Sequence, residues 1–453
     1  MSSPSDDVLI LGAGAAGLAC AERLARFGRR FTVLEARNRI GGRAWTDYSL
    51  APDFPLELGA QMVHGRHVVT HEWIRQSGLS ARAWPIAQRS LISIDRRLCR
   101  APWLAFPGYP GFGFRAYREG RRTLPERLRA MPPPDISLTE FLARQNPSPG
   151  GRRLVELLHA HAYAADSDEI GIRGPAEEER RSSEEYGYRN FRLDAGYTEL
   201  FRRRSAQYFD RIRTGVRVSA VRRTDSGVRI EAFVGDSREP TTFVAPAVVV
   251  TVPLGVLKAG SILFEPPLPA EKTTAIRRIA FGMGYALQLR LGGRELTERL
   301  GDFSMVWAGG ATTFHRPQVR RSITSEVLTA FTVGREARRR AQMGFRERID
   351  ATLAELTEAL PVGTSVSSVT AHSVHLWPED PFALGAYSFL PVDVGVAERQ
   401  TLAEPVDNVI FFAGEATHFQ GESATVHGAI ETGYRAAEQV HRALPPGAAR
   451  QSS

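Results

Sequence analysis

The stretch VLILGAGAAGLACAERLARFGRRFTVLEA, residues 8 to 36, constrains the fold of this chain more than any other feature. Its apolar run from Val8 to Leu11 predicts a parallel strand, because such strands are buried on both faces. A glycine turn follows, a helix is predicted from Ala15 to about Phe27, and RFTVLEA predicts the next strand. These elements make one βαβ unit, so we expect an α/β fold with a doubly wound sheet.

Three glycines, Gly12, Gly14 and Gly17, stand in GxGxxG register at the turn between the strand and the helix. The first permits the tight turn, the second lets a pyrophosphate approach the backbone, and the third allows the helix to pack closely on the strand. The helix N-terminus adds free amides and a positive dipole end. Glu35 ends the second strand where an acceptor for a ribose hydroxyl belongs. The pattern predicts a dinucleotide site, and the acid argues against NADP, whose extra phosphate it would repel.

The segment EARNRIGGRAWT favours FAD over NAD as the dinucleotide. It places Arg39, the pair Gly41 and Gly42, and Arg43 just beyond Glu35. There a second set of donors could bind the pyrophosphate of a more extended cofactor. LELGAQMVHG follows, and FFAGEATHFQGESATVHGAIETGYRAAEQV near the C-terminus adds another strand, an acid and a helix start.

Composition excludes several other classes of protein. The chain has 453 residues and 43% hydrophobic content, which suffices for two or three domains with sizeable cores. The net charge of +8 comes almost wholly from arginines that alternate with acids, since Lys258 and Lys272 are the only lysines. This is typical of solvated helix faces, so no nucleic-acid partner is expected. Cys20 and Cys99 predict neither a disulfide framework nor a metal site. No apolar run is long enough for a membrane span and no leader is recognisable, so we expect a cytoplasmic protein without a membrane partner.

Further segments predict the remaining organisation. From Trp84 to about Pro149, Pro- and Gly-rich aromatic pieces such as APWLAFPGYPGFGF predict pocket walls or a surface excursion. Short strands are expected in RIRTGVRVSAVRRTDSGVRIEAFV, and APAVVVTVPLGVL predicts a buried strand that returns to the first sheet. An amphipathic helix is predicted near 335–360, a strand and loop at DNVIFFAGEAT, and a last helix at ATVHGAIETGYRAAEQVHRAL.

Together these motifs resemble the flavin-dependent amine oxidase family, which includes monoamine oxidases, polyamine oxidases and lysine-specific histone demethylases. The resemblance covers nearly the whole chain through TVPLGVLKAGSILFEPPLP (251–269), LWPEDPFALGAYSF (376–389) and the C-terminal segment. It implies an α/β and α+β chain of two domains. A doubly wound, Rossmann-like FAD-binding domain (1–83, 205–282 and 391–453) is interleaved with a substrate-binding domain of mixed sheet and helices (84–204 and 283–390).

The resemblance also implies the contacts of a noncovalent FAD. The helix that begins at Thr425 and Val426 is expected to aim its amides at the flavin N1 and C2 carbonyl, where its dipole would stabilise the negative charge of the reduced state. The other expected contacts are Gly12, Gly14, Ala15, Ala16, Gly17, Glu35, Arg37, Gly42 and Arg43 around the adenosine and pyrophosphate, Ala60, Gln61 and Met62 along the flavin, Val216 at the adenine, and Gly414 and Glu415 near the ribityl chain.

Four residues are candidates for the catalytic site. They are Trp377 beside the flavin, Tyr387 as an aromatic wall, Thr425 as a small opposite wall, and His64 at the pocket. Other histidines receive a structural interpretation: His427 is expected to pack or to hydrogen-bond, and His159 and His161 share a helix without metal-ligand spacing.

Three positions depart from the family pattern. One is Thr425, which takes the place of one member of the aromatic pair that sandwiches an amine in monoamine oxidases, as in the histone demethylase type. Ala286, in FGMGYALQL, stands where the family commonly has a lysine that holds a water at the flavin N5. Lys258 and Lys272 belong to other motifs and cannot easily replace it, which puts fast reoxidation by oxygen in question. Ala386 stands where monoamine oxidases have the cysteine linked to the flavin, so a noncovalent FAD is expected.

We therefore expect an FAD-dependent amine oxidase acting on a small-molecule amine, monoamine or polyamine-like. A neutral amine passes a hydride equivalent to flavin N5, the imine is hydrolysed to a carbonyl compound, and oxygen reoxidises the flavin to give hydrogen peroxide. The alternatives are a flavin dehydrogenase or desaturase, favoured by Ala286, an L-amino-acid oxidase, which needs an arginine clamp for the carboxylate, and a flavin-binding protein without turnover. The sequence leaves the substrate and the oligomeric state open, with a homodimer as one option.

Overall fold

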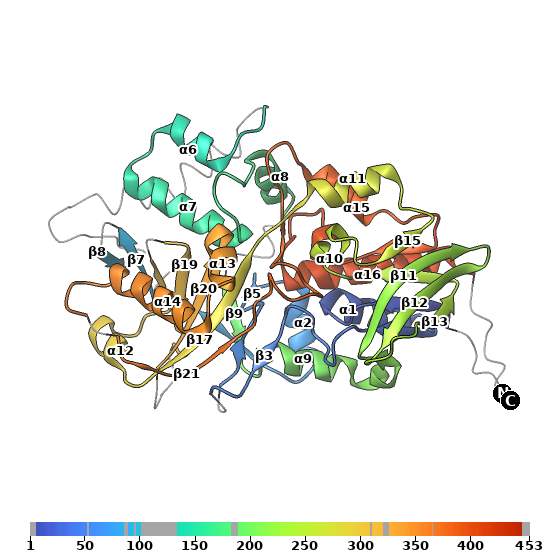
Figure 1. The fold of residues 1–453 in the computed structure, drawn as a ribbon, viewed down its shortest axis with the longest axis horizontal. Coiled ribbons are helices and arrows are strands. Elements are labelled where there is room, and N and C mark those ends of the chain that lie inside the picture. Colours follow the sequence, from blue (N-terminus) through green and yellow to red (C-terminus); the bar gives the residue numbers. More distant parts are fainter. Residues whose placement is uncertain are drawn as a thin grey trace.

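The computed structural model describes residues 6–51, 54–85, 89–94, 97–100, 134–182, 189–308, 310–319, 326–364 and 366–445. The chain forms two bodies that lie side by side (Figure 1). One is built on a five-stranded parallel sheet and the other on a seven-stranded sheet. The aromatic segment APWLAFPGYPGFGF, a predicted pocket wall, lies outside the described residues.

The parallel sheet confirms the predicted βαβ unit. β1 (Val8–Leu11) pairs with β2 (Phe31–Leu34) on one side and with β14 (Ala247–Val250) on the other, so the valine-rich run returns to the first sheet as predicted. The strand order is β10 (Ile212–Arg213), β2 (Phe31–Leu34), β1 (Val8–Leu11), β14 (Ala247–Val250) and β23 (Ile410–Phe412), and α1 (Ala15–Arg26) connects β1 to β2.

Both faces of this sheet are covered, which is why β1 is apolar throughout. Val8 and Ile10 belong to the core shared with α1 and the last helix, α16 (Val426–Ala443). Leu9 and Leu11 face a different core. That core is shared with a four-stranded sheet of β13 (Thr241–Ala245), β12 (Gly227–Val234), β11 (Val216–Thr224) and β15 (Leu263–Glu265). A sheet rather than a second layer of helices therefore covers the far face.

The seven-stranded sheet forms the second body and is mostly antiparallel. Its strand order is β21 (Val369–Val374), β17 (Gly284–Leu291), β20 (Val327–Val333), β19 (Thr312–His315), β18 (Met305–Trp307), β7 (Ser90–Ile94) and β8 (Arg97–Arg100). Tyr285, Leu287 and Leu289 of β17 face a core that includes residues of α13 (Gly334–Ala341) and α14 (Phe345–Ala359). The alternate residues of β17 face the opposite side.

The single helix predicted near 335–360 is wrong, because two helices occupy this segment. α13 ends at Ala341 and α14 begins at Phe345. Gly344, the N-cap of α14, has the extended backbone angles φ −56° and ψ 153°, which cannot continue a helix. The apolar periodicity alone did not reveal this break.

The two large sheets take their strands from different segments of the chain. Those of the parallel sheet fall in the segments expected to bind FAD, and those of the seven-stranded sheet fall in the segments expected to bind substrate. We therefore retain the two-domain division as a proposal. No helix within the described ranges is long and apolar enough to cross a membrane.

The remaining elements connect or flank these sheets. They are β3 (Thr46–Asp47), β4 (Leu56–Glu57), β5 (Val63–His64), α2 (Val69–Gln76), β6 (Ala81–Trp84), α6 (Leu138–Gln145), α7 (Pro149–Tyr163), α8 (Arg173–Arg181), β9 (Asn190–Leu193), α9 (Gly196–Ser205), η3 (Ala206–Arg211), α10 (Leu254–Lys258), α11 (Ala270–Arg278), β16 (Ala280–Phe281), α12 (Glu295–Leu300), β22 (Ser388–Phe389), α15 (Val396–Ala403) and η4 (Glu415–Thr417).

Candidate active site

A cavity of about 1580 Å³ extends from the glycine turn after β1 to the seven-stranded sheet. Pockets for drug-sized ligands hold about 300–1,000 Å³, so this cavity has room for a dinucleotide and a small substrate together. All of the site residues predicted from the sequence line it, with the exception of Gly17.

The glycine turn has the geometry that its motif predicts. Gly12 has a φ of +102°, a left-handed conformation that favours glycine. A Cβ on Gly17 would lie 2.0 Å from the carbonyl oxygen of Gly12, so this glycine serves close packing of helix and strand rather than the cavity wall. A Cβ on Gly42, whose φ is +57°, would lie 3.3 Å from the Cα of Gly14. Two glycine turns thus meet and leave bare backbone facing the cavity.

The acid at the end of β2 is fixed by backbone amides. Glu35 is buried, with 4% exposure, and accepts hydrogen bonds from the amides of Ala13 (2.7 Å) and Arg37 (2.9 Å). The Arg37 guanidinium lies 3.9 Å from Glu35 and 2.5 Å from Asp380. This network holds the carboxylate at the cavity wall, where the motif predicts a ribose contact.

A partly buried ion pair between Arg43 and Glu415 lines the cavity. Arg43 donates to the carbonyl of Ala386 (2.5 Å) and to the carboxylate of Glu415 (3.1 Å). Although burial by itself would raise the pKa of Glu415, the Arg43 charge and a hydrogen bond from Ser388 lower it below its ordinary value. Glu415 is therefore ionised and leaves Arg43 with further N–H groups for an anionic ligand.

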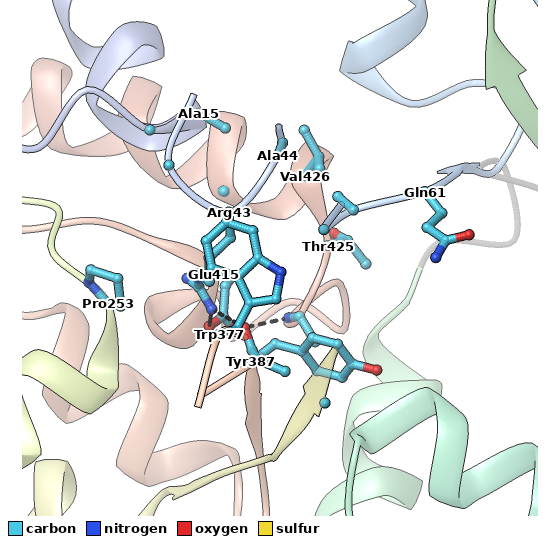
Figure 2. A pocket seen from close by; sticks show the side chains of 18 of the residues that line it. Ala15, Arg43, Ala44, Gln61, Pro253, Trp377, Tyr387, Glu415, Thr425 and Val426 are labelled. Atoms are coloured by element: carbon cyan, nitrogen blue, oxygen red, sulfur yellow. Dashed lines mark hydrogen bonds and ion pairs between the residues drawn. The ribbon is translucent and has the colours of Figure 1, made fainter. Parts of the chain in front are cut away.

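Two aromatic side chains and the start of α16 surround the next part of the cavity (Figure 2). Trp377 donates its indole N–H to the carbonyl of Leu58 (2.7 Å), and Tyr387 donates its hydroxyl to the carbonyl of His161 (2.7 Å). Thr425 is the N-cap of α16, and its Oγ1 accepts from the amide of Gly428 (2.9 Å). The first amides of a helix have no partner within the helix, so α16 directs free donors into this region.

Gln61 and His64 lie on the segment that follows β4. Gln61 lines the cavity (Figure 2), and its side-chain carbonyl oxygen accepts from the Nδ1 of His315 at 3.0 Å. His64 contacts the Asn190 side chain through Nδ1 at 2.6 Å. His64 lines the cavity, and loss of hydration together with the nearby His427 lowers its pKa, so His64 is neutral at pH 7.

No other lysine takes the place of the family lysine for which Ala286 stands. Ala286 is 1% exposed and lines the cavity. Lys258 donates to the carbonyls of Ile276, Arg277 and Ile279, and Lys272 donates to those of Thr401, Leu402 and Glu404. These are the only lysines in the sequence, and neither lines the cavity, so neither takes the place of the family lysine.

The face of the seven-stranded sheet opposite α13 and α14 forms the far wall of the cavity. Its strand pairing aligns Ala286, Phe331, Thr313, Trp307 and Ile92 in one row across five strands. The row two residues further along contains His315, Met305 and Ser90. We call this part of the cavity the chamber, and the residues that define it are Trp84, Ser90, Ile92, His161, Ala286, Met305, Trp307, Thr313, His315 and Phe331.

The sequence did not reveal the two histidines of the chamber. His161 was given only a structural interpretation and His315 none, yet both line the cavity. His315 comes to the site through the pairing of β19 with β20, and His161 through the packing of its ring against Phe331. Neither relation leaves a motif in the sequence.

Outside the chamber, carboxylates on α8 and before α16 also line the cavity. Glu178 is ion-paired with Arg399 at 2.7 Å. Glu422 contacts the Nε2 of His427 at 2.8 Å, which is a hydrogen-bonding contact of the kind expected for His427. Glu179 also lines the cavity and is exposed.

Comparison with known proteins agrees with this geometry. Residues 15–441 match the family described as flavin containing amine oxidoreductase. Polyamine oxidase 3 of Oryza sativa subsp. japonica is 30% identical over 461 residues, covering 96% of this chain and 89% of that protein. A lysine-specific histone demethylase 1 homolog 2 of the same organism is 28% identical, covering 96% of this chain and 56% of that protein.

Solved structures share the fold at lower identity. Cyclohexylamine oxidase from Brevibacterium oxydans IH-35A superposes with a TM-score of 0.79 at 23% identity, covering 97% of this chain and 99% of that one. Putrescine oxidase bound to putrescine gives a TM-score of 0.80 at 20% identity, covering 96% and 99%. These likenesses establish the α/β architecture with a Rossmann-like nucleotide-binding part.

Proposed function

This chain belongs to the family of flavin-containing amine oxidoreductases and is a flavin-dependent oxidoreductase, and from that premise we propose that it is an FAD-dependent amine oxidase with a noncovalent cofactor. The observation that carries the proposal is one continuous cavity, which joins a dinucleotide-type glycine turn to a chamber walled by aromatic rings. A flavin-binding protein without turnover would not need such a chamber beside its cofactor.

The residues present fit FAD. Gly14 and Gly42 have no Cβ, and a Cβ on Gly42 would crowd the backbone of Gly14. The absence of these side chains allows the close approach of a pyrophosphate. Glu35 would accept from the ribose, Arg43 would bind the pyrophosphate, and the amides at the start of α16 would face the polar edge of the ring. Because Ala386 takes the place of a linking cysteine, we propose that no covalent bond forms. Ala15, Ala16, Arg37, Ala60, Gln61, Met62, Val216, Gly414, Glu415 and Val426 complete the proposed contacts.

When bound, FAD supplies an acceptor for the hydride equivalent that leaves the α carbon of the amine. Tyr387 would form an aromatic wall for the amine, Trp377 beside the flavin would help to exclude water, and Thr425 would leave the wall opposite Tyr387 open. His64 is neutral, so the amine has no cationic neighbour there. An amine that enters unprotonated needs no strong base. Water hydrolyses the imine to a carbonyl compound, and oxygen takes up the two electrons to give hydrogen peroxide.

The chamber favours a monoamine with an apolar substituent. Its walls in the described part of the chain are aromatic, aliphatic or uncharged polar side chains. Burial lowers the pKa of His161 to about 3 and holds that of His315 well below its ordinary value, so both imidazoles are neutral. A second ammonium in this chamber would be buried without a counter-ion, which is strongly unfavourable.

A polyamine is the second candidate, and Glu179 is the observation that favours it. This exposed carboxylate lines the cavity, and the rice relative at 30% identity is a polyamine oxidase. If a polyamine is the substrate, its distal ammonium extends toward α8. Glu179→Gln would then raise KM for diamines at least about tenfold and leave KM for monoamines unchanged.

A spectroscopic screen tests the proposed function. The purified protein is expected to be yellow and to release FAD on acid precipitation, as a noncovalent cofactor does. Monoamines, diamines and amino acids are then mixed with it anaerobically, and loss of flavin absorbance identifies the substrate. Aerobic turnover should give one peroxide per amine. A protein that is bleached by no amine refutes the proposal, whereas bleaching without peroxide identifies a dehydrogenase.

A further inference from the structure

His161, on α7, has an imidazole whose two nitrogens are both buried and without a hydrogen-bond partner. The other two histidines near it differ. The Nδ1 of His159 contacts the carbonyl of Val155 at 2.9 Å. His315 uses both nitrogens, since Nδ1 contacts Gln61 and Nε2 contacts the hydroxyl of Thr313, each at 3.0 Å. His161 therefore keeps its full hydrogen-bonding capacity for a ligand.

The ring of His161 belongs to the wall of the chamber. Its centroid lies 5.7 Å from that of Trp307 and 5.9 Å from that of Phe331, and the residue lines the cavity. Phe331 pairs directly with Ala286 across the sheet, so the ring lies near the position of the missing lysine. The backbone carbonyl of His161 accepts the Tyr387 hydroxyl, which fixes α7 against the proposed amine site without using the imidazole.

The imidazole is neutral, because burial and the charge of Arg153 lower its pKa to about 3. A neutral imidazole carries one N–H donor and one acceptor nitrogen. Leaving both unpaired in a buried position is unfavourable, and sites of this kind strongly discriminate against ligands that cannot complete the hydrogen bond. An ordered water requires two to four polar partners, whereas of the two rings that flank His161 only the Trp307 indole carries a polar group.

We propose that His161 binds an uncharged polar group, such as a hydroxyl, on the non-reacting ring of the amine, which makes a hydroxyaryl monoamine the preferred substrate. This inference rests on the proposed amine oxidase function. Trp307 and Phe331 supply flat apolar surfaces for an aromatic ring, and His161 selects the ring that carries a hydroxyl. His161 acts in specificity and takes no part in the transfer of electrons.

Matched amines test the inference on the holoenzyme. Tyramine and 2-phenylethylamine differ only by one hydroxyl, and anaerobic stopped-flow gives, for each amine, the rate constant of flavin reduction divided by the dissociation constant. We expect wild type to prefer tyramine about tenfold or more. His161→Phe should lower this ratio to near 1, and His161→Gln, which keeps hydrogen-bonding atoms, should restore part of it. His372→Phe is the matched control, because His372 is exposed on β21 and does not line the cavity, and it should keep the wild-type ratio.

Binding without turnover gives an independent readout. 4-Ethylphenol should perturb the absorption of the oxidised flavin in wild type at a dissociation constant about tenfold below that of ethylbenzene, and His161→Phe should remove this difference. Equal reduction by both amines, or a ratio that His161→Phe leaves unchanged, overturns the assignment and leaves His161 with a bound water only. Preference for 1,4-diaminobutane over both amines also overturns it. If no amine reduces the flavin, the proposed function itself has failed.

Discussion

The amide of Ala13 donates a 2.7 Å hydrogen bond to the carboxylate of Glu35, which lies at the end of the next strand. This bond joins the glycine turn to the acid that the motif predicts as a ribose acceptor. Glu35 also accepts from the amide of Arg37, so two backbone donors fix its orientation. A carboxylate held in this way is preorganised for a ligand at the cavity wall.

Replacing this carboxylate should weaken FAD binding. In Glu35→Gln the amide NH2 group would face a backbone N–H donor, and one charge-assisted acceptor is lost. We expect the dissociation constant for FAD to rise about 10–100-fold, as measured by flavin fluorescence during titration of the apoprotein. Glu72→Gln is the control, since Glu72 is paired with Arg75 on the exposed face of α2. Equal affinity of Glu35→Gln and wild type would contradict the assigned role.

The Arg399 side chain should be essential for stability. It is fully buried, lies 2.7 Å from Glu178, and donates to the hydroxyl of Ser388. Arg399→Met leaves a buried carboxylate without its counter-ion, so we expect a loss of about 3–5 kcal/mol in the free energy of unfolding, measured by denaturant titration. Arg278→Met removes an exposed pair with Glu398 and should change stability by less than about 1 kcal/mol. Similar losses in both variants would show that burial of the pair is unimportant.

Stability should depend on pH through Glu57, a buried carboxyl on β4. Burial raises its pKa from 4.5 to about 7, because hydrogen bonds from Tyr197 and Thr46 only partly compensate for lost hydration. The folded state therefore binds the proton more tightly than the unfolded state does. This contribution is fully present below pH 4.5 and is lost as pH rises through 7, by about 3 kcal/mol in total.

The variant Glu57→Gln isolates this contribution from those of other groups. Its stability relative to wild type should improve by up to about 3 kcal/mol between pH 4.5 and pH 8, measured as the difference of two unfolding curves at each pH. Glu199→Gln, at a half-buried position of α9 where ion pairs with Arg202 and Arg203 lower the carboxyl pKa instead of raising it, should show no such improvement. A constant difference between Glu57→Gln and wild type across this range would be evidence against a raised pKa.

A lysine at position 286 should accelerate the reaction of the reduced flavin with oxygen. Ala286 lines the cavity, and neither lysine of the chain replaces the one that the family commonly has there. In Ala286→Lys, an ammonium would stabilise negative charge as oxygen is reduced. We expect the second-order rate of reoxidation to rise about tenfold or more, followed by stopped-flow absorbance. Ala286→Met adds bulk without charge, and an equal acceleration in that variant would disprove the electrostatic explanation.

The sequence predicted those parts of the fold in which neighbouring residues determine the structure. β1, α1 and β2 are found where the apolar run and the glycines place them, and α16 begins at the predicted Thr425 cap. The interruption at Gly344 was missed, because helical periodicity continues across it while the backbone does not. The strands β11 and β12 were expected, but their packing as a layer over β1 was not predicted. These strands are far from β1 in the sequence, so no local pattern indicates the contact.

The sequence alone determined the dinucleotide turn, the acid after β2 and the absence of a lysine at position 286, because each depends on residue types at fixed spacings within one short segment. Only the tertiary structure decided which side chains form the chamber. His161 and His315 come from a helix and a strand far apart in the chain, and strand register together with burial, rather than local spacing, brings their rings to the same cavity. Register depends on packing across the whole sheet, so no local pattern could specify it.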